Sequence, residues 1–273
     1  MKKFITAALF LFFASVSFAG GYKRVISLAP SVTESLYEIG MDEEVIAITV
    51  YCPKGKTKKE IIGTLLEPDF EKIIFLKPDL IISTKEGNSK AAVEKLARLG
   101  LNVYVMETSM SFEEICRNYL ELAKKVGKGN EAAKIVDEAK ESVRAVYGAI
   151  TQNGTQSVFW EVGAKPLYTA GGQSFVNDYN FYTKTENIYK NLNARYIQID
   201  VEDVITKNPD IIILANMGDI APSEIDFWKK YKTLKAAANG KIFMIDAAVF
   251  FTPTPKTFAD GAQFLAETIY ADR

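Results

Sequence analysis

The chain has 273 residues, of which 48% are hydrophobic and 25% are charged, with 33 basic side chains, 34 acidic side chains and no histidine. This composition is typical of a folded globular protein and excludes an intrinsically disordered chain. Because the charges nearly balance, nothing predicts nucleic acid or an anionic membrane surface as a partner. The length is about twice that of a common domain, which predicts two lobes.

Residues 1–19 have the pattern of a cleaved signal peptide. Lys2 and Lys3 precede the apolar run AALFLFFA, and the small residues of SFA favour cleavage after Ala19. An uncleaved membrane anchor fits less well, because the apolar run is shorter than the about 20 residues that a span needs. No cysteine follows the run as a lipid acceptor. We therefore expect a soluble exported protein.

Residues 22–127 alternate between strand-like and helix-like patterns and are predicted to form an N-terminal α/β lobe. The strand-like segments are 24–28, 45–50, 79–83 and 102–106, and the helix-like segments are 30–40, 70–77 and 91–100. Ser31, with Glu34 three residues later, predicts a capping box at the first helix. Such alternation predicts a mostly parallel sheet that is covered by helices on both faces.

Residues 128–151 are predicted to form one long helix between the lobes. Apolar residues recur at helical spacing from 130 to 150, and at 1.5 Å per residue such a helix is roughly 30 Å long. Residues 152–273 are then expected to form a C-terminal α/β lobe. Its strand patterns are SVFWEV, PDIIIL and KIFMID, and TFADGAQFLAETIYA has the pattern of a terminal amphipathic helix.

A sequence repeat links the two lobes. The stretch FEKIIFLKPDLIIS, which begins at Phe70, recurs as VEDVITKNPDIIIL from Val201. Each copy predicts a helix of about two turns that a proline ends, followed by a Pro-Asp turn and a buried strand. Glu71 and Glu202 fall in the first turn of these helices, where the helix dipole favours negative charge. The dipole is a sufficient structural reason for both glutamates.

The sequence offers little for catalysis. Without histidine, Ser-His-Asp and Cys-His catalysis and His-ligated zinc are excluded, and neither GxSxG nor GxxxxGK[ST] occurs. Pairs of carboxylates acting alone stay possible, but the 34 acidic residues show no distinctive spacing. We therefore predict no catalytic residues, no metal site and no enzyme. Cys116 lies in an apolar helical stripe, which predicts a core position, and a disulfide with Cys52 is permitted by export but not required.

Loops rich in aromatic, Gly and Pro residues follow several predicted strands. In open α/β sheets, ligands bind outside the carboxyl ends of the strands, and a cleft between lobes is a common small-molecule site. Core packing is the alternative interpretation for each aromatic ring, above all for Trp160 within its strand. The aromatic candidates for such a cleft are Tyr51, Trp160, Tyr168, Phe175, Tyr196, Phe250 and Phe251.

Several ordered segments together carry a family resemblance, which runs from about Lys23 to Tyr270. RVISLAPSVTESLYEIG, EPDFEKIIFLKPDLIIS, the long helix, VEDVITKNPDIII and TPKTFADGAQFLAETI resemble the substrate-binding proteins of ABC importers for cobalamin and ferric siderophores. The resemblance implies a class III periplasmic binding protein fold: two lobes joined by a single bridging helix, with a small-molecule ligand in the cleft. It also implies a periplasmic monomer without a cofactor of its own.

The resemblance assigns roles to particular residues. In that family, one glutamate from each lobe pairs with arginines of a permease dimer in the inner membrane, and Glu71 and Glu202 match those positions. Compared with the cobalamin binders, Leu65 stands where those proteins have a tryptophan and Val162 where they have a phenylalanine. The residues that we expect at the ligand are Pro30, Tyr51, Cys52, Leu65, Asn88, Trp160, Tyr168, Tyr196, Phe250 and Phe251.

The arginine content favours a corrinoid such as cobalamin over other metal-containing ligands. Anionic ferric chelates are usually bound by arginines, and Arg195 is the arginine that lies in a plausible cleft loop. Cys52 could contact a metal centre or could be a small apolar loop residue. A ferric siderophore, or haem with a tyrosine as axial ligand, stays as an alternative. So does an exported enzyme or sensor that reuses the fold.

Overall fold

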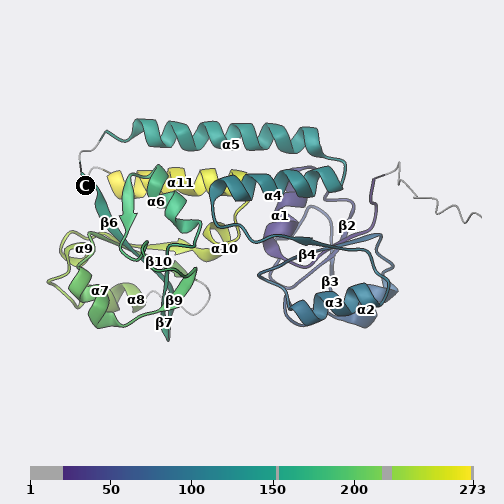
Figure 1. The fold of residues 1–273 in the computed structure, drawn as a ribbon, viewed down its shortest axis with the longest axis horizontal. Helices are drawn as coiled ribbons and strands as arrows, with labels where there is room; N and C mark the ends of the chain where they lie inside the picture. Colours follow the sequence, from purple (N-terminus) through teal and green to yellow (C-terminus); the bar gives the residue numbers. More distant parts are fainter. Residues whose placement is uncertain (1–20, 152–153, 217–222, 272–273) are drawn as a thin grey trace, which may run out of the picture.

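The computed structural model describes residues 21–151, 154–216 and 223–271, so the predicted signal peptide lies outside the described residues. Two sheets stand side by side, and one long helix runs across both (Figure 1). This arrangement confirms the predicted two-lobed α/β fold. Within the described ranges, no helix is both long and apolar enough to cross a membrane.

The N-terminal sheet is entirely parallel, in the order β3-β2-β1-β4-β5. Helices α2 and α3 lie on one side of it and α1 and α4 on the other (Figure 1). The strands are β1 (Val25–Ser27), β2 (Val45–Ile48), β3 (Glu60–Ile61), β4 (Leu80–Thr84) and β5 (Val103–Met106). The helices are α1 (Pro30–Glu38), α2 (Phe70–Phe75), α3 (Lys90–Arg98) and α4 (Phe112–Lys125).

Helix α1 begins differently from the sequence prediction. Ala29 is its N-cap and makes no side-chain capping bond, while Pro30 occupies the first turn. The predicted capping box at Ser31 and Glu34 is therefore wrong, because Ser31 already lies inside the helix and its carbonyl accepts a hydrogen bond from Ser35. Proline suits this position, since its φ is preset for a helix and its missing N–H would have no helical partner.

Helix α5 (Gly129–Ala149) connects the two lobes and lies within the predicted 128–151 segment. Its buried face consists of Ala132, Val136, Ala139 and Val143. These small and β-branched side chains pack on α4 and on the terminal helix α11 (Pro255–Tyr270). Figure 1 shows α5 above both sheets, with α4 and α11 beneath it. The lobes are therefore backed by helices that belong to both halves of the chain.

The C-terminal sheet has the order β11-β10-β6-β7-β9, and β8 pairs with β6. Strands β7 and β9 are antiparallel to their neighbours, whereas the other pairs are parallel. The strands are β6 (Gln156–Ala164), β7 (Leu167–Ala170), β8 (Thr185–Asn187), β9 (Tyr196–Gln198), β10 (Ile211–Asn216) and β11 (Ile242–Asp246). The remaining helices are α6 (Val176–Tyr182), α7 (Val201–Lys207), α8 (Ser223–Lys229), α9 (Lys235–Ala238) and α10 (Ala247–Phe250).

Two of the aromatic-rich, Gly- and Pro-containing segments that the sequence pattern predicts as loops, EVGAKPLYTAGG and NARYIQ, contain strands. Residues 161–172 contain the β6–β7 hairpin, and residues 193–198 contain β9. Strand β7 has only four residues and β9 only three, and Pro166 lies in the turn between β6 and β7. Short runs interrupted by proline carry a weak strand signal. The pairing of β7 with β9 matters for the site because it places Tyr168 and Tyr196 on neighbouring strands.

The repeated helix-to-strand unit occurs once in each lobe, as predicted. Helix α2 carries Glu71 in its first turn and α7 carries Glu202 in its first turn. After each helix the backbone turns through the left-handed region, with φ of 45° at Lys77 and 46° at Asn208. The Pro-Asp pair follows in both copies. The two copies therefore share their backbone path as well as their sequence pattern.

The aspartate of each Pro-Asp pair fastens two neighbouring strands. The Asp79 carboxylate accepts hydrogen bonds from the backbone N–H groups of Lys23 (2.7 Å) and Arg24 (3.1 Å), immediately before β1. The Asp210 carboxylate accepts from the N–H (2.9 Å) and hydroxyl (2.7 Å) of Ser157 in β6. Since β4 pairs with β1 and β10 pairs with β6, each aspartate joins the beginnings of two paired strands at the centre of its sheet.

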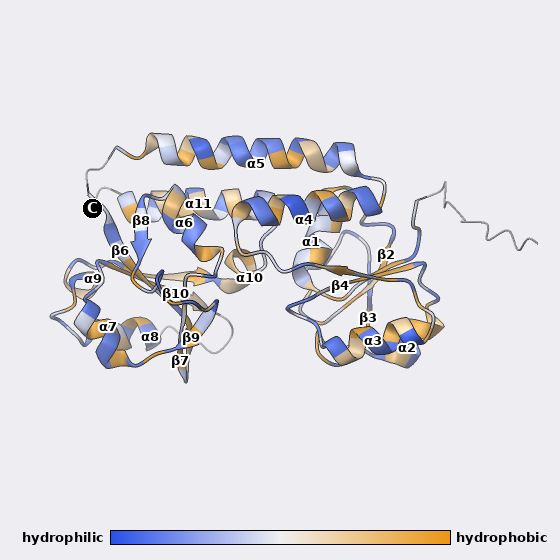
Figure 2. Ribbon diagram, in the orientation of Figure 1, coloured by the Kyte–Doolittle hydropathy of each residue, from blue (hydrophilic) through white to orange (hydrophobic). Residues whose placement is uncertain are grey.

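Hydrophobic residues are concentrated in the strands between the helical layers, as Figure 2 shows. Trp160 and Trp228 are fully buried in the C-terminal lobe. Cys116 is buried in the core, as its place in an apolar stripe predicts, and both Cys52 and Cys116 are free thiols. The fold therefore does not use the disulfide that an exported location permits.

Candidate ligand-binding site

A cavity of about 490 Å³ lies between the two lobes, within the size range of small-molecule sites. Loops that follow β1, β3, β4 and β5 contribute to its N-terminal wall, in agreement with the rule that ligands collect at the carboxyl ends of parallel strands. Strands β7 and β9 and the loop after α10 contribute the opposite wall. The cavity is therefore built from both lobes.

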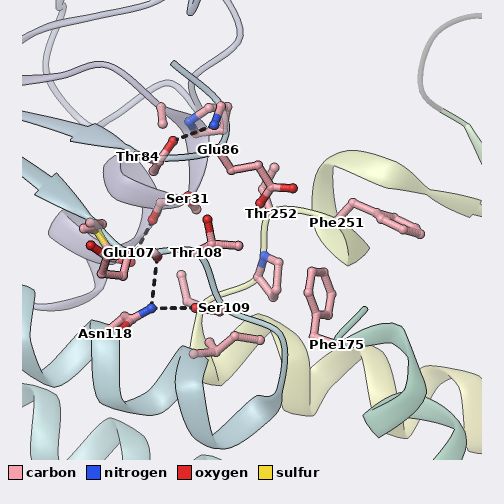
Figure 3. Close-up of a pocket in the computed structure, with 18 of the residues that line it drawn as sticks. Ser31, Thr84, Glu86, Glu107, Thr108, Ser109, Asn118, Phe175, Phe251 and Thr252 are labelled. Atoms are coloured by element: carbon pink, nitrogen blue, oxygen red, sulfur yellow. Dashed lines mark hydrogen bonds between the residues drawn. The ribbon is translucent and has the colours of Figure 1, made fainter. Parts of the chain in front are cut away.

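The N-terminal wall is rich in uncharged hydrogen-bonding groups. Figure 3 shows Ser31, Thr84, Thr108, Ser109 and Asn118 on one side of the pocket. The Asn118 side-chain amide donates to the Ser109 hydroxyl at 2.8 Å and to a backbone carbonyl of the same loop at 3.0 Å. The hydroxyls and amide are thus positioned by the loop after β5 and by α4.

The C-terminal wall is aromatic. The ring centroids of Phe175 and Phe251 are 6.2 Å apart, and those of Tyr196 and Phe251 are 6.3 Å apart. Tyr168 adds a fourth ring from β7. Burial raises the pKa of Tyr196, so its phenol stays protonated and can both donate and accept hydrogen bonds. This wall combines apolar area with hydroxyl groups.

Five of the ten residues expected at the ligand line this cavity, and Phe175, another aromatic candidate, lines it too. The residues expected at the ligand that the structure brings together here are Pro30, Leu65, Tyr168, Tyr196 and Phe251.

Trp160 and Phe250 lie in the core and not at the cavity wall. Trp160 is 1% exposed, and its indole N–H donates to the Asn180 side chain at 2.9 Å. Its ring stands behind Phe251, with centroids 6.4 Å apart. Phe250 is buried against the ring of Tyr179. Trp160 therefore supports the aromatic wall from behind, in agreement with its interpretation as a core residue, and Phe250 belongs to the core.

Tyr51 and Cys52 lie outside the cavity lining. Tyr51 is 69% exposed on the loop after β2. Cys52 is buried, and its sulfur lies 3.1 Å from the Thr49 hydroxyl. The small-residue role of Cys52 therefore fits the structure, whereas contact with a metal centre in the cavity does not.

Asn88 shapes the cavity from behind. Its side-chain carbonyl accepts from the Thr84 N–H at 2.8 Å, and its amide donates to the carbonyls of Leu28 (2.9 Å) and Leu65 (3.0 Å). One buried side chain thus connects three loops of the N-terminal wall. Asn88 is a positioning residue in this structure, because its polar atoms are used by the backbone.

The cavity lining includes two acidic side chains, Glu86 and Glu107, and one basic side chain, Arg195. Arg195 forms an ion pair with Glu86 from the other lobe. The Glu107 carboxylate pairs with Lys85 at 2.8 Å. In the part of the chain that the structure describes, no three Cys, Asp or Glu residues cluster as a metal site would require.

A buried carboxyl joins the lobes next to the cavity, and the sequence pattern does not reveal it. The Glu38 carboxylate accepts a hydrogen bond from the Thr254 hydroxyl at 2.7 Å, and Thr254 also caps α11. Burial raises the pKa of Glu38 to about 7. Burial and the Glu38 carboxyl raise the pKa of the Tyr119 phenol, which lines the cavity. The sequence does predict a helix start at Thr254, because a threonine before a proline is typical of one. It does not predict the bond to Glu38, which lies 216 residues away in the chain.

Glu71 and Glu202 are exposed and are not among the residues that line the cavity. Figure 1 shows their helices, α2 and α7, on the face of the molecule opposite α5, one in each lobe. The repeat therefore presents one acidic side chain from each lobe on the same side of the molecule.

Comparison with known proteins identifies the family. Residues 25–249 match the periplasmic binding protein model. The vitamin B12-binding protein of Vibrio parahaemolyticus is 30% identical over 256 residues, which cover 90% of each chain. The crystal structure of the vitamin B12-binding protein BtuF of Vibrio cholerae is 25% identical, with a TM-score of 0.75 over 91% of this chain and 97% of that one. A possible iron-binding protein from Staphylococcus epidermidis is 27% identical, with a TM-score of 0.81 over 92% of this chain and 100% of that one. The chain belongs to the periplasmic binding protein family.

Proposed function

We propose that this protein is the substrate-binding component of an ABC importer and that it carries a corrinoid in the interlobe cavity. The lining is the observation that carries this proposal: uncharged hydroxyls and an amide on one wall and aromatic rings on the other. A corrinoid offers a broad flat ring and many neutral amides, which these two walls complement. The similarity to vitamin B12-binding proteins supports the same cargo.

The charges of the cavity point in the same direction. An anionic chelate needs free cations, and the guanidinium of Arg195 is already paired with Glu86. The metal of the corrinoid is cargo in this proposal, and the protein has no cofactor and no catalytic role of its own. The signal peptide 1–19 would deliver the chain to the periplasm, where it acts as a monomer.

The proposed partner is a permease dimer in the inner membrane. Glu71 and Glu202 stand on one face of the molecule, and each is presented by the first turn of a helix at the tip of its lobe. A two-fold partner with one cationic site per subunit would complement this pair of acids. Neither glutamate approaches the cavity, so docking and cargo binding use separate surfaces.

A ferric chelate or haem is the second candidate cargo. Tyr168 lines the cavity and remains partly exposed, and a tyrosine phenol is a known axial ligand of haem iron. The similarity to a possible iron-binding protein supports this alternative.

Direct binding tests distinguish the candidates. We expect the purified mature chain to bind cyanocobalamin with a Kd in the micromolar range or tighter by calorimetry. At 100 times Kd the ligand should stabilise the fold by about 2.7 kcal/mol, seen as a higher Tm. Tyr168→Ala should weaken binding, whereas Tyr51→Ala, a matched change outside the cavity, should not. Binding of haemin or a ferric siderophore without corrinoid binding would favour the second candidate, and failure with all three would contradict the transport proposal.

A further inference from the structure

An ion pair crosses the cavity between the two lobes. Glu86 lies on the loop after β4, and Arg195 immediately precedes β9. Both side chains line the cavity. Of the ion pairs among the described residues, this one joins the N-terminal sheet region to the C-terminal sheet region directly across the cleft.

Arg195 is held in place at the aromatic wall. Its guanidinium carbon lies 5.6 Å from the ring centroid of Phe175 and 5.5 Å from that of Tyr196, which are cation–π distances. The side chain is 19% exposed. Its Nε–H is buried and has no hydrogen-bond partner among the described residues. The Arg195 guanidinium is therefore held at the cavity wall, and its Nε–H is a hydrogen-bond donor without an acceptor among the described residues.

Glu86 decides whether this cation is available to a ligand. The other lining carboxylate, Glu107, is paired with Lys85 and does not contact Arg195 in the structure. Of the two lining carboxylates, Glu86 is therefore the one that neutralises the positive charge of Arg195. Removing one member of a partly buried ion pair leaves the other uncompensated, and a free guanidinium binds carboxylate or chelate oxygens as a rigid fork.

We propose that Glu86 is a specificity-determining residue that keeps the cavity selective for neutral cargo by neutralising Arg195. This inference rests on the proposed function only in placing the cargo in this cavity. Anionic chelates must compete with the Glu86 carboxylate for the guanidinium, whereas a neutral macrocycle packs on the aromatic rings and leaves the pair intact. Selectivity then depends on one side chain that is contributed by the lobe opposite the arginine.

The test compares wild type with Glu86→Gln, using cyanocobalamin as the neutral probe and haemin and a ferric tris-catecholate as anionic probes. We expect Glu86→Gln to raise the affinity for the anionic probes about tenfold or more, because a hydrogen-bonded charge becomes available. The affinity for cyanocobalamin should change by less than about threefold, since the neutral probe does not use that charge. The gain should fall with added salt.

Two further variants make the test specific. Glu186→Gln removes a carboxylate that is paired with Lys190 at 3.0 Å outside the cavity lining, and it should leave the preference between probes unchanged. Glu86→Gln combined with Arg195→Gln should lose the gain, because the freed cation is absent. Melting curves of each variant verify that the fold persists. An unchanged preference in Glu86→Gln, or a gain that survives in the double variant, would overturn the inference.

The outcomes also separate this inference from the proposed cargo. Wild type that binds cyanocobalamin, together with a Glu86→Gln variant of unchanged preference, contradicts the selectivity role alone. Wild type that ignores cyanocobalamin, together with a variant that gains anionic probes through Arg195, contradicts the corrinoid assignment and supports the role of Glu86. Tight binding of the anionic probes by wild type through Arg195 contradicts the selectivity role.

Discussion

The two lobes share one scaffold unit and differ in what they add to it. In each, a short helix with an acidic first turn leads through a left-handed residue and a Pro-Asp pair into a strand beside the lobe's central strand. The N-terminal sheet is entirely parallel, whereas the C-terminal sheet inserts the antiparallel strands β7 and β9. The shared unit builds the frame of each lobe, and the strands that only the C-terminal lobe has carry Tyr168 and Tyr196, which line the cavity.

The difference explains why the cavity has two unlike walls. Loops after parallel strands supply short polar side chains from the N-terminal lobe, and the antiparallel strands present rings from the C-terminal lobe. The central strands differ as well, because β1 carries buried Ser27 whereas β6 carries buried Glu161. Mutations in a feature that both lobes share should therefore have similar effects in the two lobes. Mutations in a feature that only one lobe has should have no counterpart in the other lobe.

The largest expected effect is on uptake and concerns the acidic first turns of α2 and α7, which carry Glu71 and Glu202. In the native host lacking its own copy of the gene, Glu71→Ala with Glu202→Ala should reduce uptake of labelled cyanocobalamin by about 100-fold or more, because charge pairs at a docking surface dominate partner recognition. Cyanocobalamin affinity should not change. Each single variant should have a partial effect if the lobes dock equivalently.

Glu141→Ala, on the exposed face of α5 away from both tips, is the control and should transport normally. Loss of ligand binding in the double variant, or normal uptake, would contradict the docking role.

A second prediction uses the buried carboxyl that only the C-terminal central strand carries. Burial raises the pKa of Glu161 from its ordinary 4.5 to about 7. The folded state therefore keeps a proton that the unfolded state releases, so the stabilisation present below about pH 4.5 is lost as pH rises through 7. Glu161→Gln should match wild type near pH 4.5 and gain up to about 3 kcal/mol over it by pH 8.

Glutamine can still accept the hydrogen bond that the Trp228 indole donates to Glu161 at 2.6 Å. Denaturant unfolding at several pH values measures the difference between the variants. Glu141→Gln, an exposed carboxyl, should show no such divergence. A Glu161→Gln curve parallel to that of wild type would mean that Glu161 is ionised in the folded protein at neutral pH.

The smallest expected effect concerns Asp79 and Asp210, whose carboxylates hold two neighbouring strands together in each lobe. Asp79→Ala and Asp210→Ala each remove a carboxylate that accepts two hydrogen bonds, so each should cost about 1–3 kcal/mol of unfolding free energy. Asp226→Ala, on the exposed face of α8, should stay within about 0.5 kcal/mol of wild type. Chemical denaturation measures the unfolding free energy of all three variants. A large loss for only one of Asp79→Ala and Asp210→Ala would show that the two lobes do not depend equally on this aspartate.

Local patterns predicted the elements better than they predicted the site. Periodicity identified the long parallel strands and α5, because those segments bury a continuous face. It missed β7 and β9, whose three or four residues hold too little pattern. The first-helix capping box was wrong because Pro30 competes with Ser31 for the helix start and wins.

Half of the expected ligand residues line the cavity because loops at strand ends converge whatever their exact register. The others depend on side-chain direction, which sequence does not report: Trp160 points into the core and Asn88 towards backbone carbonyls. The Glu86–Arg195 pair spans 109 residues and the Glu38–Thr254 bond spans 216. Contacts of such separation leave no local signal.

The Asn88 side chain has a consequence for the entropy of binding. By tying the loops at Leu28, Leu65 and Thr84 together before any ligand arrives, it leaves the N-terminal wall with little freedom to lose. A preorganised wall binds without the ordering cost that flexible loops incur. Adaptation to cargo of different shape then falls to the C-terminal wall, where the Tyr168 side chain is partly exposed.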